Sequence, residues 1–588
     1  MTTMRDRWKT EIVHTLHGMA RDKGLSEADV RDDMVALETP PRPELGDLAV
    51  PLFPFAKLFR AAPAAIATEV ASRLSETEIG HCEAAGPYLN IRFARSAVVR
   101  DVLESVLREG DRFGRTDELS TQRIMIEFSC PNTNKPLHLG HLRNDILGES
   151  LSRILAANGA DVRKVNLIND RGVHICKSML AYQRFGNGAT PESEGIKSDH
   201  FVGAYYVRFN QWVNEDADAE TQAREMLQRW EAGDAEVIAL WEQMNRWAID
   251  GISETYRRTG ISFDDIYYES KTYLSGRDEV LRGLQEGVFY RENDGSVWVD
   301  LEEINLDKKV LLRGDGTSLY LTQDIGTAIA RHGDWPFDRL IYVVASEQRY
   351  HFAVLFHVLQ KLGMEWGKDL FHLAYGMVNL PEGKMKSREG TVVDADELIA
   401  GLERMAADEI RAKGREEEVG DVNRTAGDVA LGALHYYLLQ VNPVKDMVFD
   451  PRESISFNGN TGPYLQYTGA RISTMLRKLG QDNSGSGTGS GSTVDYAMLR
   501  EDLEWELVKQ ISHVSDAGST AGRQYSPSVL TGYLYELAKT FSRYYHDHPI
   551  AIEKDVAVRT ARVALSRAVV QVLQNGCELI AVPFLHVM

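Results

Sequence analysis

The chain has 588 residues, of which 43% are hydrophobic and 26% charged, so it can form three or four domains with buried cores. Its formal net charge of −20 excludes a generally basic surface, so a nucleic-acid partner would be held by local basic patches, shape and stacking on aromatic rings. No run of 18 apolar residues occurs and the N-terminus lacks an apolar core, so we expect a cytoplasmic protein without a membrane span. The four cysteines form no CxxC pair, which argues against disulfides and structural zinc.

The first 118 residues mix helix and strand patterns. A strand is expected at residues 88–93 and a turn at Gly46-Asp47. Helical periodicity covers residues 5–23, 62–74 and 97–107. Residues 1–118 are therefore expected to form a separate α+β domain.

From residue 119 to about 400, apolar strands alternate with helices, which predicts an α/β domain with a Rossmann-type, doubly wound parallel sheet. This region is interrupted by an insertion at about 188–309. Within the insertion, an acidic helical stretch at 219–256 carries several tryptophans. We expect these rings to pack between helices; stacking on nucleic-acid bases is the alternative.

A strand at residues 123–128 is followed by PNTNKPLHLGH at residues 131–141 and by a helical pattern from about Leu142. Ligands of open α/β sheets collect at the carboxyl ends of strands, where a helix N-terminus offers free N–H groups to phosphate. Gly140 lets an adenine or ribose approach the backbone, while His138 and His141 can donate hydrogen bonds to charge developing on an α-phosphate. The pattern favours adenylate formation, and its alternatives are a metal site or an ordinary helix cap.

A second signal, KMKSREG, occupies residues 384–390. It follows a β-like run at 372–380 and a turn at residues 381–383. A glycine-bounded loop carrying Lys384, Lys386 and Arg388 suits a leaving pyrophosphate, whose charge grows as the α–β bond breaks. The alternative is a solvated basic loop.

Together the two stretches resemble the HIGH and KMSKS signatures of class I aminoacyl-tRNA synthetases. Neighbouring stretches narrow the resemblance to the arginyl-tRNA synthetase family and extend it over nearly the whole chain. These stretches are EFSCPN at 127–132, YLTQDI at 320–325, IYVVASEQ at 341–348 and GNTGPYLQY at 459–467. The resemblance implies ATP-dependent activation of L-arginine to arginyl-adenylate and its transfer to the 3′ end of tRNA(Arg), with release of AMP and pyrophosphate.

The resemblance also assigns the arginine pocket. It places Asn132, His138 and Gln348 at the amino and carboxyl ends of arginine, and it places Glu127, Tyr320 and Asp324 at its guanidinium. The chemistry agrees, because a planar, permanently charged guanidinium is best matched by carboxylates that accept forked N–H bonds. For Glu127, which lies in an apolar strand, the alternative is an ion pair with one of the chain's own arginines.

The resemblance implies ATP as a substrate, with Mg²⁺ entering on its phosphates and no other metal. The expected ATP-binding residues are Pro131, His138, Gly140, His141, Met385 and Ser387. Lys384, Lys386 and Arg388, with His138 and His141, would stabilise the transition state.

Two positions depart from the family pattern. Ser387 stands where the second lysine of KMSKS would fall, and Lys135 is favoured over Lys386 as its replacement. Residues 169–174, NDRGVH, replace a Gly-Asp-Trp-Gly-like sequence, and we expect them to contact the adenylate side of the pocket.

Strand alternation ends near residue 422. After a connecting stem at 401–424, long amphipathic helices are expected at 425–441, 463–478, 496–516, 526–546 and 556–573. Residues 425–588 resemble the family's all-α anticodon-binding domain, and residues 1–118 resemble its N-terminal domain, which contacts the tRNA corner. Tyr464 and Tyr467 are candidates for stacking on anticodon bases, and Met588 lies where the family's C-terminal end approaches the anticodon. Packing of both tyrosines within the helical core is the alternative. The Gly/Ser-rich tract at 480–493 is expected to be a surface loop.

Three rival functions stand beside this interpretation: another class I specificity, a non-catalytic tRNA-binding paralogue and a stand-alone nucleotidyltransferase. The pocket carboxylates argue against the first, the retained HxGH argues against the second, and the helical C-terminal third argues against the third. We expect a monomer, because no coiled coil or long apolar stripe is evident.

Overall fold

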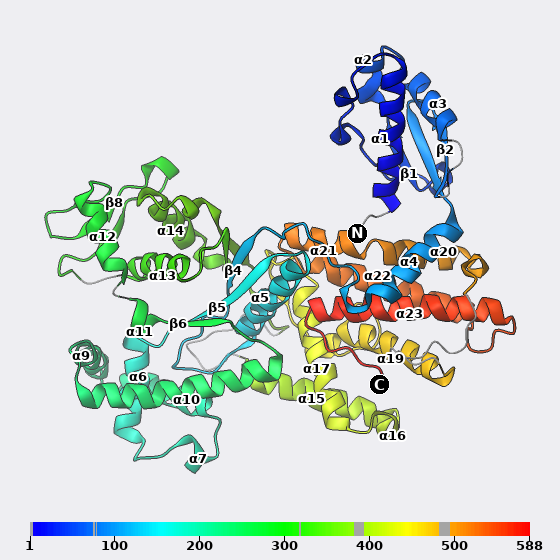
Figure 1. Cartoon of the computed structure of the whole chain (residues 1–588). Coiled ribbons are helices and arrows are strands. Elements are labelled where there is room, and N and C mark those ends of the chain that lie inside the picture. The colour runs from blue at the N-terminus through cyan, green and yellow to red at the C-terminus, as the bar shows by residue number, and fades with distance from the viewer. Residues whose placement is uncertain are drawn as a thin grey trace. The chain divides into compact units, whose positions relative to one another are not determined.

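The computed structural model describes residues 4–74, 77, 79–273, 275–316, 319–381, 393–480 and 494–588 (Figure 1). The chain forms two compact units. The first contains Met1–Phe113, Ile472–Ser515 and Glu536–Asn575. The second contains Gly114–Arg471, Asp516–Tyr535 and Gly576–Met588. The second signature, at residues 384–390, and the Gly/Ser-rich tract at 481–493 lie outside the described residues.

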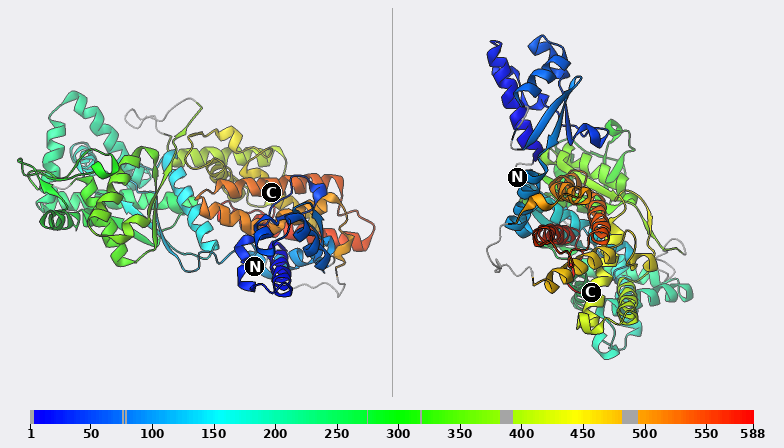
Figure 2. Two further views of the ribbon diagram at one scale, coloured as in Figure 1. Left: turned by 90° about the horizontal axis from the view of Figure 1, so that it is seen from above. Right: turned by 90° about the vertical axis from the view of Figure 1, so that its right-hand side faces the viewer.

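The N-terminal part of the first unit is a small α+β arrangement, shown in blue from two further directions in Figure 2. Strand β3 (Tyr88–Phe93) lies between β1 (Leu48–Pro51) and β2 (Gly80–Ala85) in an antiparallel sheet. Helices α1 (Met4–Asp22) and α3 (Pro63–Arg73) bury an apolar core on it that includes Trp8 and Leu16. Gly46 has a φ of 121°, and an added Cβ would lie 2.6 Å from the carbonyl oxygen of Ile91, so the expected turn requires glycine.

The rest of the first unit is helical, with α4 (Arg95–Glu109), α20 (Asp502–Ser512) and most of α22 (Ser528–Asp547) and α23 (Val556–Leu579). The prediction of a single helix at 496–516 is wrong. The chain forms a short 3₁₀ turn (Tyr496–Met498), then α20, then α21 (Val514–Arg523). Helix α20 starts where Glu501 and Glu504 form a capping box, which fixes a new N-terminus inside the apolar pattern.

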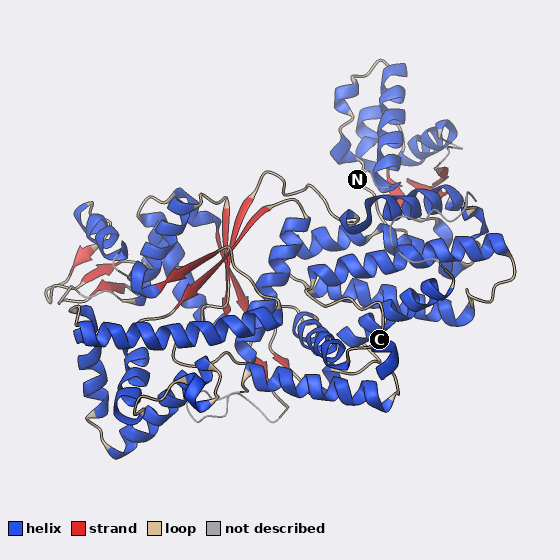
Figure 3. Ribbon diagram, turned by 60° about the horizontal axis from the view of Figure 1, so that its bottom comes forward, coloured by secondary structure: helices blue, strands red, loops and turns tan. Residues whose placement is uncertain are grey.

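The second unit contains a five-stranded parallel sheet in the order β11-β10-β4-β5-β6, drawn in red with helices beside it in Figure 3. Its strands are β4 (Arg123–Glu127), β5 (Asp161–Ile168), β6 (Asp265–Tyr268), β10 (Arg339–Ala345) and β11 (Leu370–Tyr375). Helix α5 (Leu139–Ala157) joins β4 to β5, while α13 (Tyr320–Asp334) precedes β10 and α14 (Arg349–Lys361) follows it. The predicted parallel sheet is confirmed.

The β-like run at 372–380 is two strands. Strand β11 ends at Tyr375, and β12 (Val378–Asn379) pairs with β13 (Met447–Val448). An added Cβ on Gly376 would lie 2.3 Å from the carbonyl carbon of Lys445, so the chain crosses this junction only with glycine.

Between β5 and β6 lie α6 (Val173–Phe185), α7 (Pro191–Glu194), α8 (Ser198–Glu215), α9 (Ala219–Glu231) and α10 (Ala235–Thr259). The helical stretch expected at 219–256 is divided at Gly233, whose φ is 82°. The tryptophans pack between these helices, as expected: Trp230 and Trp241 have ring centroids 5.3 Å apart, and Trp212 is buried beside Phe209. A small antiparallel sheet follows, formed by β7 (Tyr290–Arg291), β8 (Val297–Val299) and β9 (Lys309–Leu312).

Downstream of the sheet, this unit also contains α15 (Ala395–Ala412), α16 (Glu416–Val419), α17 (Val422–Leu439) and the part of α19 (Gly462–Lys478) up to Arg471. Across the described part of the chain, every helix is too short or too polar to cross a membrane. The architecture is an α/β parallel-sheet domain accompanied by an α+β N-terminal region and a helical C-terminal region, as the sequence predicts.

Candidate adenylate-forming site

The end of β4 is held in an unusual backbone conformation. Ser129 and Cys130 have φ values of 74° and 50°, which are costly for residues with a Cβ, at about 1–3 kcal/mol each. The N–H of Ser129 donates to Oδ1 of Asn144 at 2.7 Å, and the N–H of Cys130 donates to Oδ1 of Asn166 at 3.1 Å. These buried amides fix the direction in which the chain leaves the sheet towards the HxGH stretch.

His138 and His141 sit at the start of α5 with their rings 3.8 Å apart. Nδ1 of His138 accepts from the N–H of Gly140, and Nδ1 of His141 accepts from the N–H of His138, both at 3.1 Å. Burial, reinforced by Lys135, lowers the pKa of His138 to about 4, and burial lowers the pKa of His141 as well. Both rings are therefore neutral at pH 7 and carry their proton on Nε2, where it can be donated to a ligand.

This geometry bears on the alternatives for HxGH. The helix-cap interpretation accounts for both Nδ1 atoms but leaves both Nε2 protons without a role. A metal site formed by Cys130 and the two histidines is not found. Among the described residues, the single candidate metal cluster consists of Asp199, His200 and Asp396. Lys135 is the cation beside the pair, and burial lowers its pKa. Within the described part of the chain its ammonium has no ion-pair partner, so its charge remains available to a phosphate.

Glu127, at the end of β4, is paired with the chain's own Arg331. Both side chains are buried, with 6% and 1% exposed, and the guanidinium contacts the carboxylate directly. Burial raises the pKa of Glu127, and the charge of Arg331 opposes that shift. The ion-pair alternative therefore describes the observed contact of Glu127, and Arg331 was not anticipated from the sequence.

The remaining guanidinium candidates lie on the first turns of α13. Tyr320 is 69% exposed, and Asp324 follows it by one helical turn, with a third of its side chain exposed. Asp324 and Glu127 are near enough for the charge of Asp324 to raise the pKa of Glu127. Oδ2 of Asp324 lies 2.5 Å from Nε2 of His351, a residue that the sequence did not single out.

Asn132 and Gln348 lie beyond the carboxyl ends of adjacent strands. Asn132 is half-buried and forms a parallel bridge with Asn169, and Gln348 is exposed just after β10. The structure thus brings Glu127 near Asp324, and Lys135, His138 and His141 together. Within the described residues, neither Gln348 nor Tyr320 forms a hydrogen bond or ring contact with these groups.

Residues 169–174, which depart from the family pattern, begin with Asn169, which is bonded to Cys130 and Pro131 just after β4. The Asn169 N–H donates to the carbonyl of Pro131 at 2.9 Å, and the Asn169 side chain donates to that of Cys130 at 2.9 Å. Burial, with Lys135, lowers the pKa of His174 to about 4. The expected contact with this side of the site agrees with these bonds but stays a prediction for the ligand itself.

Arg143, two residues after the HxGH stretch, is a site residue that the sequence analysis missed. It is fully buried, and its guanidinium donates to the carbonyl oxygens of Gly376, Met377, Pro443 and Lys445 at 2.6 to 3.2 Å. It ties α5 to the chain that leads from β11 into β12. A charged residue within an otherwise apolar helix face was the available signal.

The tRNA candidates at the helical end lie in more buried surroundings. Tyr467 packs against an apolar cluster that includes Ile410 and Met588, and Met588 is 7% exposed. The ring of Tyr464 lies 5.8 Å from that of Tyr535. A recess of about 260 Å³ beside Tyr467 and Met588 is bordered by Lys413 and Arg415. Packing accounts for the position of Tyr467, while contact with tRNA stays a prediction for all three residues.

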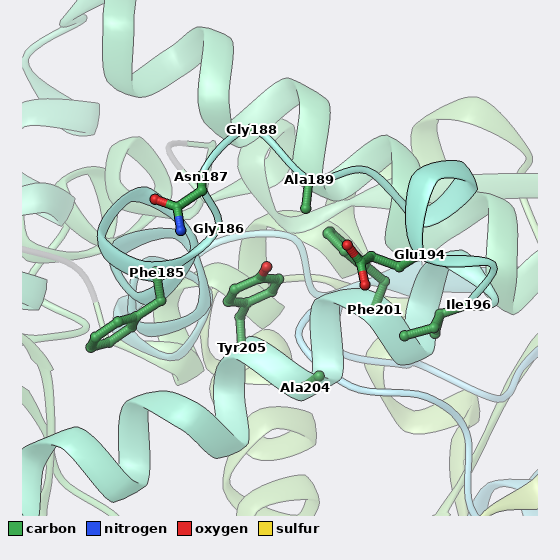
Figure 4. A pocket seen from close by; sticks show the side chains of 10 residues that line it. All are labelled: Phe185, Gly186, Asn187, Gly188, Ala189, Glu194, Ile196, Phe201, Ala204 and Tyr205. Atoms are coloured by element: carbon green, nitrogen blue, oxygen red, sulfur yellow. The ribbon is translucent and has the colours of Figure 1, made fainter.

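A recess larger than the one beside Tyr467 lies elsewhere in the second unit. Its volume is about 530 Å³, and it lies between the end of α6 and the start of α8, where the side chains of Glu194, Phe201 and Tyr205 converge (Figure 4). No residue expected to bind arginine or ATP lines it among the described residues.

The parallel sheet and its histidine-capped helix define a class I aminoacyl-tRNA synthetase catalytic domain. Residues 102–451 match the family model "tRNA synthetases class I (R), catalytic domain". Residues 6–93 match "Arginyl tRNA synthetase N terminal domain", and residues 465–588 match "DALR anticodon binding domain". The chain belongs to the arginyl-tRNA synthetase family.

Individual relatives agree over the full length. The chain is 57% identical to "Arginine--tRNA ligase" of Treponema denticola and 52% identical to that of Treponema pallidum, with 100% of each chain covered. Among solved structures, it resembles Thermus thermophilus arginyl-tRNA synthetase with a TM-score of 0.80 and 26% identity, covering 99% of this chain and 100% of the other.

Proposed function

We propose that the chain activates L-arginine with ATP and transfers it to tRNA(Arg), releasing AMP and pyrophosphate. The observation that carries this proposal is the histidine pair at the start of α5, whose Nδ1 atoms both accept backbone hydrogen bonds, so that each Nε2 proton is left to donate to a ligand. Family membership, shown by full-length relatives, supports the same reaction.

In the first step the arginine carboxylate attacks the α-phosphate of ATP in line, and the bond to pyrophosphate breaks. Nε2–H of His138 and of His141 stabilise the growing negative charge on the α-phosphate, and Lys135 neutralises phosphate charge from the same side. Mg²⁺ enters with ATP as part of the substrate. Lys384, Lys386 and Arg388 would receive the pyrophosphate, and Pro131, Gly140, Met385 and Ser387 would hold the nucleotide. No covalent enzyme intermediate is required.

In the second step a ribose hydroxyl at the 3′ end of tRNA attacks the activated carbonyl of arginyl-adenylate. The contribution of the chain is positioning and electrostatic stabilisation.

Arginine selection rests first on Asp324. Its carboxylate offers about four acceptor positions, of which His351 uses one, so a forked guanidinium can still be accepted. Tyr320 lies one helical turn before Asp324. Asn132 and Gln348 are assigned to the amino and carboxyl ends of arginine. Glu127 acts through its negative charge while it is bonded to Arg331. Hydrogen bonds to charged groups contribute roughly 1.5–3 kcal/mol each, so lysine, which lacks the fork, is disfavoured.

We place the tRNA-binding regions at the two ends of the chain. Residues 1–118 would contact the tRNA corner, and residues 119–400, with an insertion at about 188–309, would carry the chemistry. Residues 401–424 would form a connecting stem, and residues 425–588 would bind the anticodon. Tyr464, Tyr467 and Met588 are the candidates there. A cytoplasmic monomer completes the proposal.

The test is attachment of labelled arginine, lysine or glutamate to total tRNA in the presence of ATP and Mg²⁺. Charging with arginine alone, lost in Asp324→Ala and His138→Ala, is the expected result. Retained tRNA binding without charging of any amino acid would overturn the proposal in favour of a non-catalytic tRNA-binding paralogue.

A further inference from the structure

The N-terminus of α15 is bonded directly to the HxGH backbone. The N–H of Leu139 donates to the carbonyl of Val393 at 3.1 Å, and the N–H of Ala395 donates to that of Leu137 at 3.0 Å. His138 and Asp394 form the antiparallel bridge between these bonds. The position of the His138 backbone is therefore coupled to the position of the first residues of α15.

A network of charged side chains holds that N-terminus in place. We call it the α15 clasp, and it consists of Lys197, Asp199 and His200 at the start of α8, Thr255 and Arg258 at the end of α10, and Asp394 and Asp396 at the start of α15. Its centre is Oδ2 of Asp396, which lies 2.7 Å from Nζ of Lys197, 3.2 Å from the hydroxyl of Thr255 and 3.3 Å from Nε2 of His200. Arg258 reaches its other oxygen at 3.4 Å.

The clasp extends to Asp394 as well. Oδ2 of Asp394 lies 3.3 Å from Nε2 of His200, while Oδ1 caps α15 by accepting from the N–H of Glu397 at 3.0 Å. His200 thus spans two carboxylates on either side of Ala395, the residue whose N–H is bonded to Leu137. Six ionisable side chains, from two other helices and from α15 itself, converge on one turn of backbone.

The same atoms could be mistaken for a cation site, since Asp199, His200 and Asp396 place three ligand atoms within 4.8 Å of one another. However, the ammonium of Lys197 already contacts both carboxylates, at 3.0 and 2.7 Å, and Arg258 adds a second positive charge. These two protein cations already lie against the carboxylates, so a metal ion would meet repulsion. The geometry indicates an ion-pair network that orders backbone.

We infer that Asp396 is a positioning residue for adenylate formation: through α15 and the Leu137–Leu139 backbone, it sets the aim of the His138 imidazole at the α-phosphate. The inference rests on the proposed function. Among the described residues, the side chain of Asp396 contacts Lys197, His200, Thr255 and Arg258 and none of the side chains assigned to ATP or arginine. A displacement of the His138 ring by a fraction of an ångström would weaken bonds that matter most in the transition state, which lowers kcat more than it raises KM.

The clasp also gives the effect a pH dependence. The hydrogen bond to Asp396 raises the pKa of His200, and Asp394 and Asp199 add to that shift, while burial and Lys197 oppose it. Arg258, from α10, faces the same carboxylate. His200 is therefore positively charged at the lower end of the working range and loses its charge as the pH rises, which weakens its hold on both carboxylates. We therefore expect kcat to decline as the pH rises through the pKa of His200.

The experiment compares the full-length wild type with Asp396→Asn and His200→Gln in arginine-dependent ATP–pyrophosphate exchange, with tRNA present, over a range of pH. We expect kcat to fall about tenfold in Asp396→Asn with KM for arginine nearly unchanged. We also expect its alkaline limb to move to lower pH, and we expect that limb to be lost in His200→Gln. Partial recovery in Asp396→Glu would mark a role for the charge itself.

The matched control is Glu220→Gln, which breaks the ion pair with Lys177 in the same group of helices, with Nζ and Oε1 at 2.5 Å, and lies outside the clasp. It should retain the wild-type kcat and pH profile. Wild-type kcat and pH profile in Asp396→Asn would overturn the inference. It would also be overturned if kcat in Asp396→Asn and in Glu220→Gln fell in the same proportion to their loss of thermal stability. A wild type without arginine-dependent exchange would instead overturn the proposed function.

Discussion

Nε2 of His351 lies 2.5 Å from Oδ2 of Asp324, on the carboxylate assigned to the arginine guanidinium. One nitrogen of the imidazole thus fixes the orientation of the carboxylate while leaving Oδ1 and part of Oδ2 to a substrate. The ring of His351 is itself packed against Phe352, with centroids 5.7 Å apart, so its own direction is set by the helix that follows β10.

His351→Ala should therefore raise KM for arginine about tenfold and change kcat little, because an unrestrained Asp324 must be ordered by the substrate. Steady-state exchange kinetics at varied arginine concentration measure both constants. A lower KM in the variant would show that the imidazole competes with the guanidinium, contrary to the orientation described above.

Asp324→Asn removes one negative charge and half of the acceptors of a forked guanidinium. The loss of a charged hydrogen bond, roughly 1.5–3 kcal/mol, corresponds to a drop in kcat/KM for arginine of about ten- to a hundredfold. The ratio of arginine to lysine activation should fall with it. The control is Glu347→Gln, which changes an exposed carboxylate just before α14 and should leave the ratio unchanged. An unaltered ratio in Asp324→Asn would remove this residue from the pocket.

Arg143→Lys should destabilise the second unit. A lysine can reach one or two of the four carbonyl oxygens that Arg143 binds, and the others are then left without a donor in a buried place at about 1–3 kcal/mol each. We expect a lower urea midpoint together with lower exchange activity. Arg424→Lys, on an exposed turn of α17, should be neutral in both measurements. Equal midpoints for the two variants would contradict a bracing role for Arg143.

Burial raises the pKa of Asp145 to about 7, far above its ordinary value of 3.8. Between those values the folded chain holds a proton on Asp145 that the unfolded chain has released. The contribution of this residue to stability is therefore complete below about pH 4 and declines as the pH rises towards 7. Asp145→Asn should remove that slope, so the difference in unfolding free energy between variant and wild type should grow in favour of the variant from pH 4 to 7. A constant difference would show that Asp145 does not titrate in this range.

Several elements could be predicted from the sequence because local patterns determine them. Strand β3 occupies the expected residues 88–93, since a short β-type run directly after the turn signal Gly86-Pro87 leaves little choice of where the strand begins. The parallel sheet likewise follows from strands alternating with helices. The prediction of a single helix at 496–516 was wrong because a capping box at Glu501 and Glu504 begins a new helix within one apolar stripe. Apolar periodicity alone does not reveal this local signal.

Within the candidate site, the residue types at the ends of strands could be predicted, but their partners could not. Arg331 follows Glu127 by about two hundred positions, and Arg143 binds carbonyl oxygens more than two hundred residues away. Such pairs depend on the tertiary fold, and no spacing in the chain encodes them. The same holds for His200 and Asp396, whose contact joins two helices far apart in sequence.

Arg143 holds α5 directly, whereas the clasp holds α5 only indirectly, by ordering the start of α15, and these two supports differ in their sensitivity to ionic strength. Arg143 is enclosed by neutral peptide carbonyls and has no access to dissolved ions, so added salt should leave its bonds intact. The carboxylates and cations around Asp396 are 17 to 31% exposed at Lys197, Asp396 and Arg258, and their attraction is partly screened by salt. In concentrated electrolyte, the chain upstream of the second signature would remain fastened to α5, while the start of α15, downstream of it, would lose side-chain support and depend on its backbone bonds to residues 137–139.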